Sequence, residues 1–411
     1  MFGAIGFGLL VGSCCTLISS LSSSSFSLRK SFVAACKSLN LTVTSGDTVT
    51  LPIVNAEYSH SWGTRLLVSL PVGLSSSKVM EQQKGLSEAL RHDIEMTYKD
   101  GLIVDIFTQP MPDNVPFEVT TPKHSYKIPI GVNRRGDWRY YDFDGKFPHL
   151  LIGGISGGGK SVILRAILTT LVTGPAPDMY LCDLKGGVEL GIFRNLACVK
   201  GFSTALPDVL KAATDVEAEM NRRYAIMAVN GSQEWQGKKV VFVMDELADL
   251  KIGKADTQAA IKGQIKSRLT TLSAKGRAAG VLLVLCTQRP DASVVDGLIK
   301  TNVATSICFR TRDGTQSRII LDHDGAADLP EIPGRLIFQQ GREEVLQAPF
   351  LSAADAKKLI SDLPKNQPAQ NCAGLSENPI LDSHSVGKES VKNATKHPDK
   401  DIPLEGNSLE L

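Results

Sequence analysis

Residues 149–172 read HLLIGGISGGGKSVILRAILTTLV, and this stretch decides the fold class of the chain. An apolar segment typical of a buried strand leads into a glycine-rich turn, which leads into a segment typical of a helix. Gly154 to Ser161 fit the pattern G-x-x-x-x-G-K-[ST] in the strand–turn–helix context that this motif requires. Glycines let backbone amides converge on phosphate oxygens at a helix N-terminus. The sequence therefore predicts a phosphate-binding loop for a nucleotide.

Each part of this loop has an expected role toward ATP and Mg²⁺. Lys160 supplies a positive charge for the β- and γ-phosphates, and Ser161 supplies a hydroxyl ligand for Mg²⁺. The predicted nucleotide-binding residues are Gly154, Ile155, Ser156, Gly157, Gly158, Gly159, Lys160 and Ser161.

Two further apolar segments end in polar residues. Residues 240–246 read VVFVMDE, so Asp245 and Glu246 follow a predicted buried strand. We expect Asp245 to hold the Mg²⁺ shell and Glu246 to orient or deprotonate the attacking water. Residues 281–290 read VLLVLCTQRP, which places Gln288 at another strand end, where it would sense the γ-phosphate and fix the same water. Ligands of α/β folds bind at such carboxyl ends.

The fold class predicted for residues 126–363 is α/β, with a largely parallel sheet covered by helices on both faces. The expected strands are His149–Gly154, Met179–Asp183, Val240–Asp245, Val281–Thr287 and Thr305–Phe309.

A small α/β accessory domain is predicted before this core, at residues 31–125. Arg65–Leu70 and Leu102–Thr108 are typical of strands, and Ser75–Glu95 has the periodicity of an amphipathic helix. Its apolar positions are Val79, Leu86, Ala89, Leu90 and Ile94.

The two ends of the chain differ from the rest in composition. Met1 to Leu21 carry no charge and are rich enough in apolar residues to predict a single membrane span within residues 1–28. Arg29 and Lys30 follow, which favours a cytoplasmic location for everything after them, in a protein of the cell membrane. A flexible apolar tail is the alternative. Residues 364–411 are polar and charged and are predicted to be disordered.

Composition narrows the function classes. The 411 residues carry a formal net charge of +2, which excludes a protein that binds nucleic acid by bulk charge alone. The eight cysteines include no C-x-x-C pair, so neither a disulfide framework nor a zinc site is predicted. A run of basic residues between the second and third motifs would suit phosphate contacts to DNA, although a solvated helix face explains most of it. These residues are Lys251, Lys254, Lys262, Lys266, Arg268, Lys275 and Arg277.

The three motifs together resemble the FtsK/SpoIIIE family within the HerA–FtsK group of P-loop ATPases. Further matches are EMNRRYAIM at 219–227, KGRAAGVLLVLCTQRPD at 275–291, DGLIKTNVATSICFR at 296–310 and SRIILDHDGA at 317–326. The resemblance covers roughly residues 126–355 and implies a RecA-like core that assembles as a hexameric ring and pulls double-stranded DNA through its pore, independently of sequence, using ATP.

In such rings a neighbouring subunit inserts an arginine that stabilises charge on the transferred phosphoryl group. Arg318 is the first candidate for this residue, with Arg310 and Arg277 in reserve, and a plain surface ion pair is the alternative for each.

The chain departs from the larger chromosome-pumping members, which have several spans and a winged-helix module. It looks more like the coupling proteins of conjugative elements, whose partners are a relaxase or transfer-channel proteins. Its expected biological role is conjugative transfer, or partition of a chromosome or plasmid. Two other functions stay open: an ATPase that moves proteins in a secretion system, and a nucleotide-dependent scaffold. Retention of both Asp245 and Glu246 argues against the scaffold.

Overall fold

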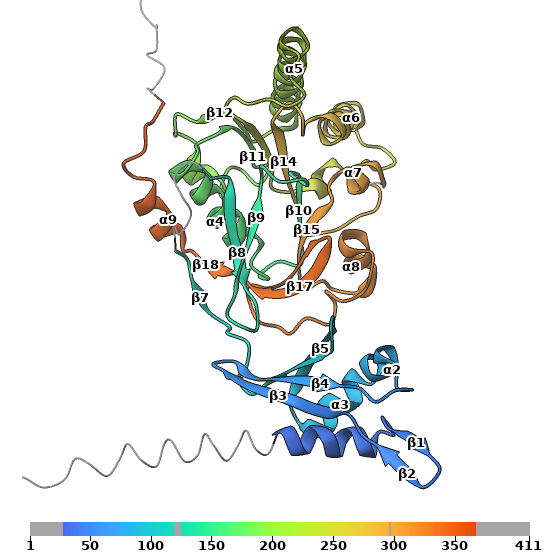
Figure 1. Cartoon of the computed structure of the whole chain (residues 1–411). Helices are drawn as coiled ribbons and strands as arrows, with labels where there is room; N and C mark the ends of the chain where they lie inside the picture. The colour runs from blue at the N-terminus through green and yellow to red at the C-terminus, as the bar shows by residue number, and fades with distance from the viewer. Residues whose placement is uncertain (1–27, 119–124, 296, 367–411) are drawn as a thin grey trace, which may run out of the picture. The chain divides into compact units, whose positions relative to one another are not determined.

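The structure is a computed structural model that describes residues 28–118, 125–295 and 297–366 (Figure 1). Most of its strands belong to two sheets, one of ten strands and one of four. The larger sheet is formed by residues 127–347 and the smaller by residues 53–107. The phosphate-binding motif belongs to the larger sheet.

Six neighbouring strands of the larger sheet run parallel to one another, as the alternation of apolar strands and helices predicts. The five strands predicted here are confirmed, with ends displaced by one residue at most. Because β10 lies between β14 and β15, and β13 lies on the other side of β14, the ends of the three motif strands meet at one edge. In spatial order the strands are β12 (Val199–Ser203), β11 (Asp178–Cys182), β13 (Val240–Met244), β14 (Val281–Thr287), β10 (Leu150–Gly153) and β15 (Thr305–Phe309).

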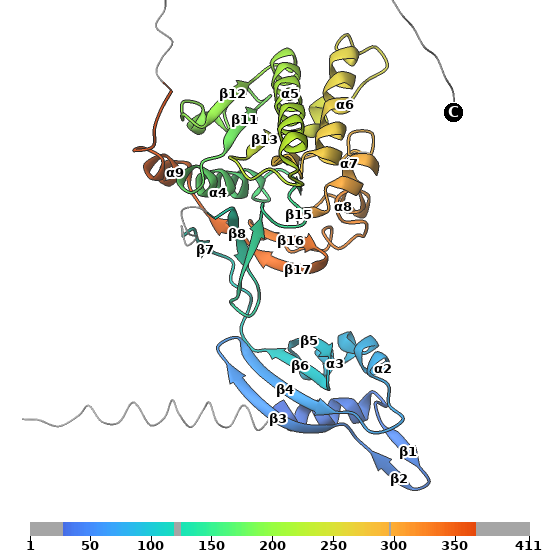
Figure 2. The same cartoon turned by 45° about the horizontal axis from the view of Figure 1, so that its top comes forward.

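Helices cover both faces of this parallel part. Alternate strand residues face opposite sides, so Leu150 packs in the core beside α4 (Lys160–Thr173) while Leu151 packs in the core on the opposite face. That second core holds α5 (Leu206–Asn230) and α6 (Ala259–Lys275), which lie side by side (Figure 2). Both leucines are completely buried, which is the pattern of a strand covered on its two faces.

Four antiparallel strands extend the sheet beyond β15, and the alternation pattern does not predict them. The turn between the first two is tight, because Gly341 alone separates them and adopts a positive φ of 71°. In spatial order the four strands are β16 (Arg335–Gln340), β17 (Arg342–Gln347), β8 (Lys127–Val132) and β9 (Trp138–Asp142).

The smaller sheet confirms the two strands predicted near the N-terminus and adds two more. All of its neighbouring strands are antiparallel. Apolar side chains from one face pack on two short helices between residues 76 and 90 and on a helix over residues 28–38. The spatial order is β3 (Ile53–His60), β4 (Gly63–Ser69), β6 (Leu102–Phe107) and β5 (Asp93–Tyr98).

The single helix predicted for Ser75–Glu95 is wrong. Two short helices, α2 (Ser76–Glu81) and α3 (Gln83–Leu90), occupy its first part, and β5 begins at Asp93. The second helix ends where Arg91 adopts the left-handed conformation, with φ of 55°, and its amide bonds back to the last turn.

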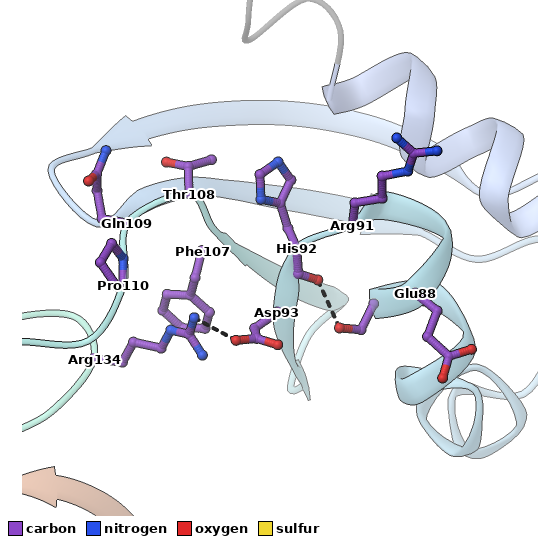
Figure 3. Close-up of a pocket in the computed structure, with 10 residues that line it drawn as sticks. Glu88, Arg91, His92, Asp93, Phe107, Thr108, Gln109, Pro110 and Arg134 are labelled. Atoms are coloured by element: carbon purple, nitrogen blue, oxygen red, sulfur yellow. Dashed lines mark hydrogen bonds and ion pairs between the residues drawn. The ribbon is translucent and has the colours of Figure 1, made fainter. Parts of the chain in front are cut away.

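Ion pairs join the smaller sheet to the turn that follows β8. Arg134 lies 2.7 Å from Asp93 and over the ring of Phe107, at one end of a pocket of about 330 Å³ (Figure 3). Arg135 lies 2.7 Å from Asp105, which Arg65 also contacts at 2.6 Å. Burial alone would raise the pKa of Asp105, but the hydrogen bonds from the two guanidinium groups hold it below its ordinary value. The buried carboxylate is thereby a shared acceptor for both segments.

The remaining elements are short. They are β1 (Val43–Ser45), β2 (Thr48–Thr50), β7 (Val115–Pro116), β18 (Pro349–Phe350), α7 (Gly297–Asn302), α8 (Gly314–Leu321) and α9 (Ala353–Leu359).

The predicted membrane span, Met1–Leu21, and residues 367–411 of the predicted tail lie outside the described residues. Within the described ranges, no helix has the length and apolar composition needed to cross a bilayer. The first tail residues are ordered, since Ala197 donates its amide to the Pro364 carbonyl at 2.8 Å. Five cysteines fall in the described ranges and all are free thiols: Cys36, Cys182, Cys198, Cys286 and Cys308.

Candidate nucleotide-binding and hydrolysis site

The phosphate-binding loop connects β10 to α4 and packs closely against Phe309 at the end of β15. Gly154 has φ of 141°, and a Cβ there would lie 2.6 Å from Cβ of Phe309. Gly159 has φ of 120°, and a Cβ there would lie 3.0 Å from Cε1 in the ring of Phe309. Only glycine fits at these two positions, which is why the loop approaches β15 so closely. No side chain among the described residues caps the N-terminus of α4, so its amides are available for an anion.

Lys160 is turned toward the acidic strand end. Its ammonium lies 2.8 Å from both the backbone oxygen and Oδ1 of Asp245, and the side chains are 3% and 0% exposed. Burial lowers the pKa of Lys160, but nearby negative charge, including that of Asp245, raises it above its usual value. The predicted phosphate ligand and the predicted metal ligand therefore form a buried ion pair.

Glu246 is fixed by the end of β14. Its Oε1 accepts hydrogen bonds from Oγ1 of Thr287 at 2.9 Å and from the amide of Gln288 at 3.0 Å. It also accepts from the amide of Ala248, at the start of a short 3₁₀ turn over Leu247–Leu250. Glu246 is buried, and these donors orient its carboxylate at the carboxyl edge of the sheet.

Gln288 connects the third strand end to the phosphate-binding loop. Its side-chain oxygen accepts a hydrogen bond from Oγ of Ser156 at 2.6 Å. Ser156, Glu246 and Gln288 line one cavity of about 930 Å³, so the three sequence motifs meet at this place. Burial and the charge of Glu246 raise the pKa of Asp249, which also lines the cavity.

Lys185 belongs to this site and none of the three motifs contains it. It follows β11, and its ammonium lies 3.1 Å from Oδ2 of Asp245 and 3.6 Å from Oε2 of Glu246. The signal that would have found it is positional: Asp183-Leu184-Lys185 follows a buried parallel strand, as Asp245 and Glu246 do.

The donors present fit a Mg²⁺ ion that is bound together with a nucleotide. Asp245 Oδ2 is buried and accepts no hydrogen bond from the described residues, although Lys185 lies close to it. Ser161 is partly exposed at the first turn of α4. No group of three or more His, Cys, Asp or Glu side chains in the described ranges is arranged to hold a metal ion. Mg²⁺ commonly binds through one or two protein oxygens plus phosphates and waters, which matches this sparse set.

None of the three arginine candidates lines this cavity. Arg318 is on α8, with a side chain 57% exposed and 2.5 Å from Asp324. Arg310 follows β15 and lies 2.5 Å from Glu331, and Arg277 lies 3.9 Å from Glu234. Among the described residues that line the cavity are Arg289 and Arg312 but none of these three. An arginine that serves a neighbouring subunit need not reach its own cavity.

The basic run around α6 is largely paired within the chain. Lys251 lies 2.5 Å from Asp291, Lys262 lies 2.8 Å from Asp256, and Arg268 contacts Glu217. These three basic side chains are therefore ion-paired within the chain.

Parts of this chain are similar to known proteins. Residues 115–239 match the family model described as FtsK/SpoIIIE family. Residues 115–239 are therefore similar to the FtsK/SpoIIIE family. The chain is 30% identical over 274 residues to the DNA translocase FtsK of Listeria monocytogenes, and 30% identical over 268 residues to that of Streptococcus pneumoniae. These matches cover 61% and 59% of this chain and 35% and 34% of the relatives, so the chain spans about a third of their length.

Solved structures extend the likeness beyond the family model. The pCW3 conjugation coupling protein TcpA, solved with ATPγS, is similar with a TM-score of 0.58 and 26% identity, over 82% of this chain and 99% of that one. The cytoplasmic domain of the type VII secretion ATPase EccC of Thermomonospora curvata is similar with a TM-score of 0.52 over 67% of this chain and 34% of that one. At 22% identity the second likeness shows the fold alone. The larger sheet and its helices have the RecA-like fold of P-loop ATPases, as predicted.

Proposed function

We propose that this protein is an ATP-driven DNA translocase. The observation that carries the proposal is the convergence of Lys160, Asp245, Glu246 and Gln288 at one sheet edge in a chain that is similar to this family. The relatives named DNA translocase FtsK and the coupling protein TcpA support DNA as the substrate moved.

In the proposed hydrolysis, the residues at this sheet edge bind ATP and direct a water toward it. The backbone amides of residues 154–159 and the ammonium of Lys160 bind the phosphates, for which Lys160 leaves Asp245. When bound through Asp245 and Ser161, Mg²⁺ supplies positive charge that offsets the charge on the phosphate oxygens. Glu246 orients a water whose oxygen attacks the γ-phosphorus, and it accepts the proton that the water loses. The bond from this phosphorus to the β–γ bridging oxygen breaks, and ADP leaves. Gln288 fixes the same water, and Arg318 serves the site of a neighbouring subunit.

Three further features belong to the proposal. A homohexameric ring would give Arg318 a neighbouring site to enter, and its pore would hold double-stranded DNA through sequence-independent phosphate contacts. Residues 1–28 would tether the ring to the cell membrane with residues after 30 in the cytoplasm. A relaxase or channel proteins would then deliver or receive the DNA in conjugative transfer, with partition of a chromosome or plasmid as the other setting.

The decisive experiment measures ATP turnover of the full-length chain, in detergent, with and without long duplex DNA across a salt series. Stimulation that falls as salt rises is the expected result, because phosphate contacts release counterions. A scrambled duplex of equal length should stimulate equally. Turnover that DNA does not change would favour an ATPase of a protein-secretion system, because this chain shares the fold of the secretion ATPase EccC. Absence of turnover would favour a scaffold.

The membrane tether is tested separately. Removal of residues 1–28 should move the protein from the membrane fraction to the supernatant after carbonate washing. A full-length chain that already fractionates without membranes would contradict the tether.

A further inference from the structure

Lys185 lies in a loop whose shape is set by one buried carboxylate. Asp183 is completely buried and accepts hydrogen bonds from the amides of Lys185 at 3.1 Å, Glu189 at 2.9 Å and Leu190 at 2.9 Å. Gly186 has φ of 77°, which turns the chain directly after Lys185. The backbone that presents this lysine is therefore held firmly against the end of β11.

The ammonium of Lys185 is shared between two buried acids. It lies 3.1 Å from Asp245 and 3.6 Å from Glu246, whose side chains are 0% and 7% exposed, while its own side chain is 34% exposed. Coulomb interactions at such distances are much stronger near buried carboxylates than between exposed side chains. Lys185 also lines the cavity that contains Ser156 and Gln288.

Asp245 thus carries one ammonium on each oxygen. Lys160 hydrogen-bonds to Oδ1, whereas Lys185 lies near Oδ2 without the geometry of a hydrogen bond. A divalent ion bound at Asp245 would place a second cation beside Lys185, and like charges so close repel. Lys185 would then keep its ion pair with Glu246 alone. The Oε2 atom of Glu246 already accepts a hydrogen bond from the amide of Gln288.

We propose that Lys185 is a positioning residue with two consecutive partners. In the nucleotide-free protein it balances the charge of Asp245, and once the metal and nucleotide bind it holds Glu246 in the orientation that directs the attacking water. This inference rests on the proposed ATP hydrolysis for its second half only, because the first half concerns the protein without nucleotide.

The first test uses no nucleotide and no turnover. Binding of Mn²⁺ alone to the full-length chain is measured by electron paramagnetic resonance for wild type, Lys185→Met and Lys185→Gln. Both variants should bind Mn²⁺ about tenfold more tightly, because the competing ammonium at Asp245 is gone. Lys200→Met is the matched control: Lys200 is on β12, a half-exposed lysine 3.8 Å from Asp178, and its loss should leave Mn²⁺ affinity unchanged. Equal affinity in wild type and both Lys185 variants would overturn the proposal.

The second test separates positioning from binding. Lys185→Met should lower kcat about tenfold while the Kd for ATPγS changes less than about twofold, because Glu246 loses its orienting partner and the phosphate ligands stay. Lys185→Arg keeps the charge and should restore most of kcat. A kcat that equals wild type in Lys185→Met would also overturn the proposal. If wild type itself hydrolyses no ATP, the proposed function fails, while the Mn²⁺ comparison still decides the first role of Lys185.

Discussion

The ammonium of Lys160 lies 2.8 Å from Oδ1 of Asp245, so the lysine proposed to bind phosphate and the aspartate proposed to bind Mg²⁺ neutralise one another. Both are buried, so each charge needs the other as a partner. In the proposed function, binding of Mg²⁺ and ATP would replace this pair with two new ones, which would couple the binding of the metal to that of the nucleotide.

Lys160→Ala should abolish ATP binding and should also destabilise the nucleotide-free protein. The variant leaves Asp245 buried with only Lys185 nearby, and breaking a buried pair costs about 3 kcal/mol. Calorimetric titration with ATPγS and urea unfolding measure the two effects, with Lys200→Ala as the control. Retained nucleotide affinity would contradict the role given to Lys160.

Glu246→Gln should bind ATP normally and hydrolyse it at least about a hundredfold more slowly, because an amide does not accept the proton of the water. The amide oxygen still accepts from Thr287 and Gln288, so the fold should be preserved. A filter-binding assay for trapped ATP, together with phosphate release, measures this. Hydrolysis at the wild-type rate would show that another group activates the water.

Arg318→Ala should remove activity from the neighbouring subunit and leave its own phosphate site intact. Mixing it with Lys160→Ala subunits should partly restore turnover, since some interfaces then combine an intact loop with an intact arginine. The ATPase rate across mixing ratios measures this, and Arg277→Ala serves as a comparison. If no ratio restores activity, Arg318 is not the arginine supplied in trans.

His149 should make the protein less stable as the pH falls through the range from about 6.5 to about 4. Burial lowers the pKa of this histidine from 6.5 to about 4, while its Nδ1 accepts from the amide of Leu283. The unfolded chain therefore binds a proton that the folded chain does not, and stability is full above pH 6.5. The loss by pH 4 is about 3 kcal/mol.

Urea unfolding at several pH values compares wild type with His149→Asn, whose side-chain oxygen keeps an acceptor for Leu283. The variant should lose less stability over this range, and equal slopes would argue against His149 as the cause.

Much of the large sheet was predictable because its strands are continuous apolar runs with polar residues after them. Val240–Met244 and Val281–Thr287 are buried along their full length, and burial on both faces leaves this unbroken pattern. The order of the strands in space was not predictable, yet it is what brings Glu246 to Gln288.

The helix predicted for Ser75–Glu95 shows how a mostly correct burial pattern gives a wrong element. Val79, Leu86, Leu90 and Ile94 are buried, as predicted, but Ala89 is exposed and Ile94 is buried as part of a strand. Periodicity indicates which side chains face the core, but it does not show that α3 ends at Arg91. Likewise the long-range partners Asp291 and Glu217 of the basic run are invisible to sequence alone.

The amide of Ile155 donates to the carbonyl of Arg310 at 2.9 Å, and the amide of Gly334 donates to the carbonyl of Gly158 at 2.8 Å. The phosphate-binding loop is thus hydrogen-bonded to Arg310, which precedes α8, and to Gly334, which precedes β16. In the proposed ring, a change in this loop on ATP binding or hydrolysis would reach Arg318 on α8 through the hydrogen bond between Ile155 and Arg310. The nucleotide bound to one subunit would then affect the arginine that this subunit presents to the next.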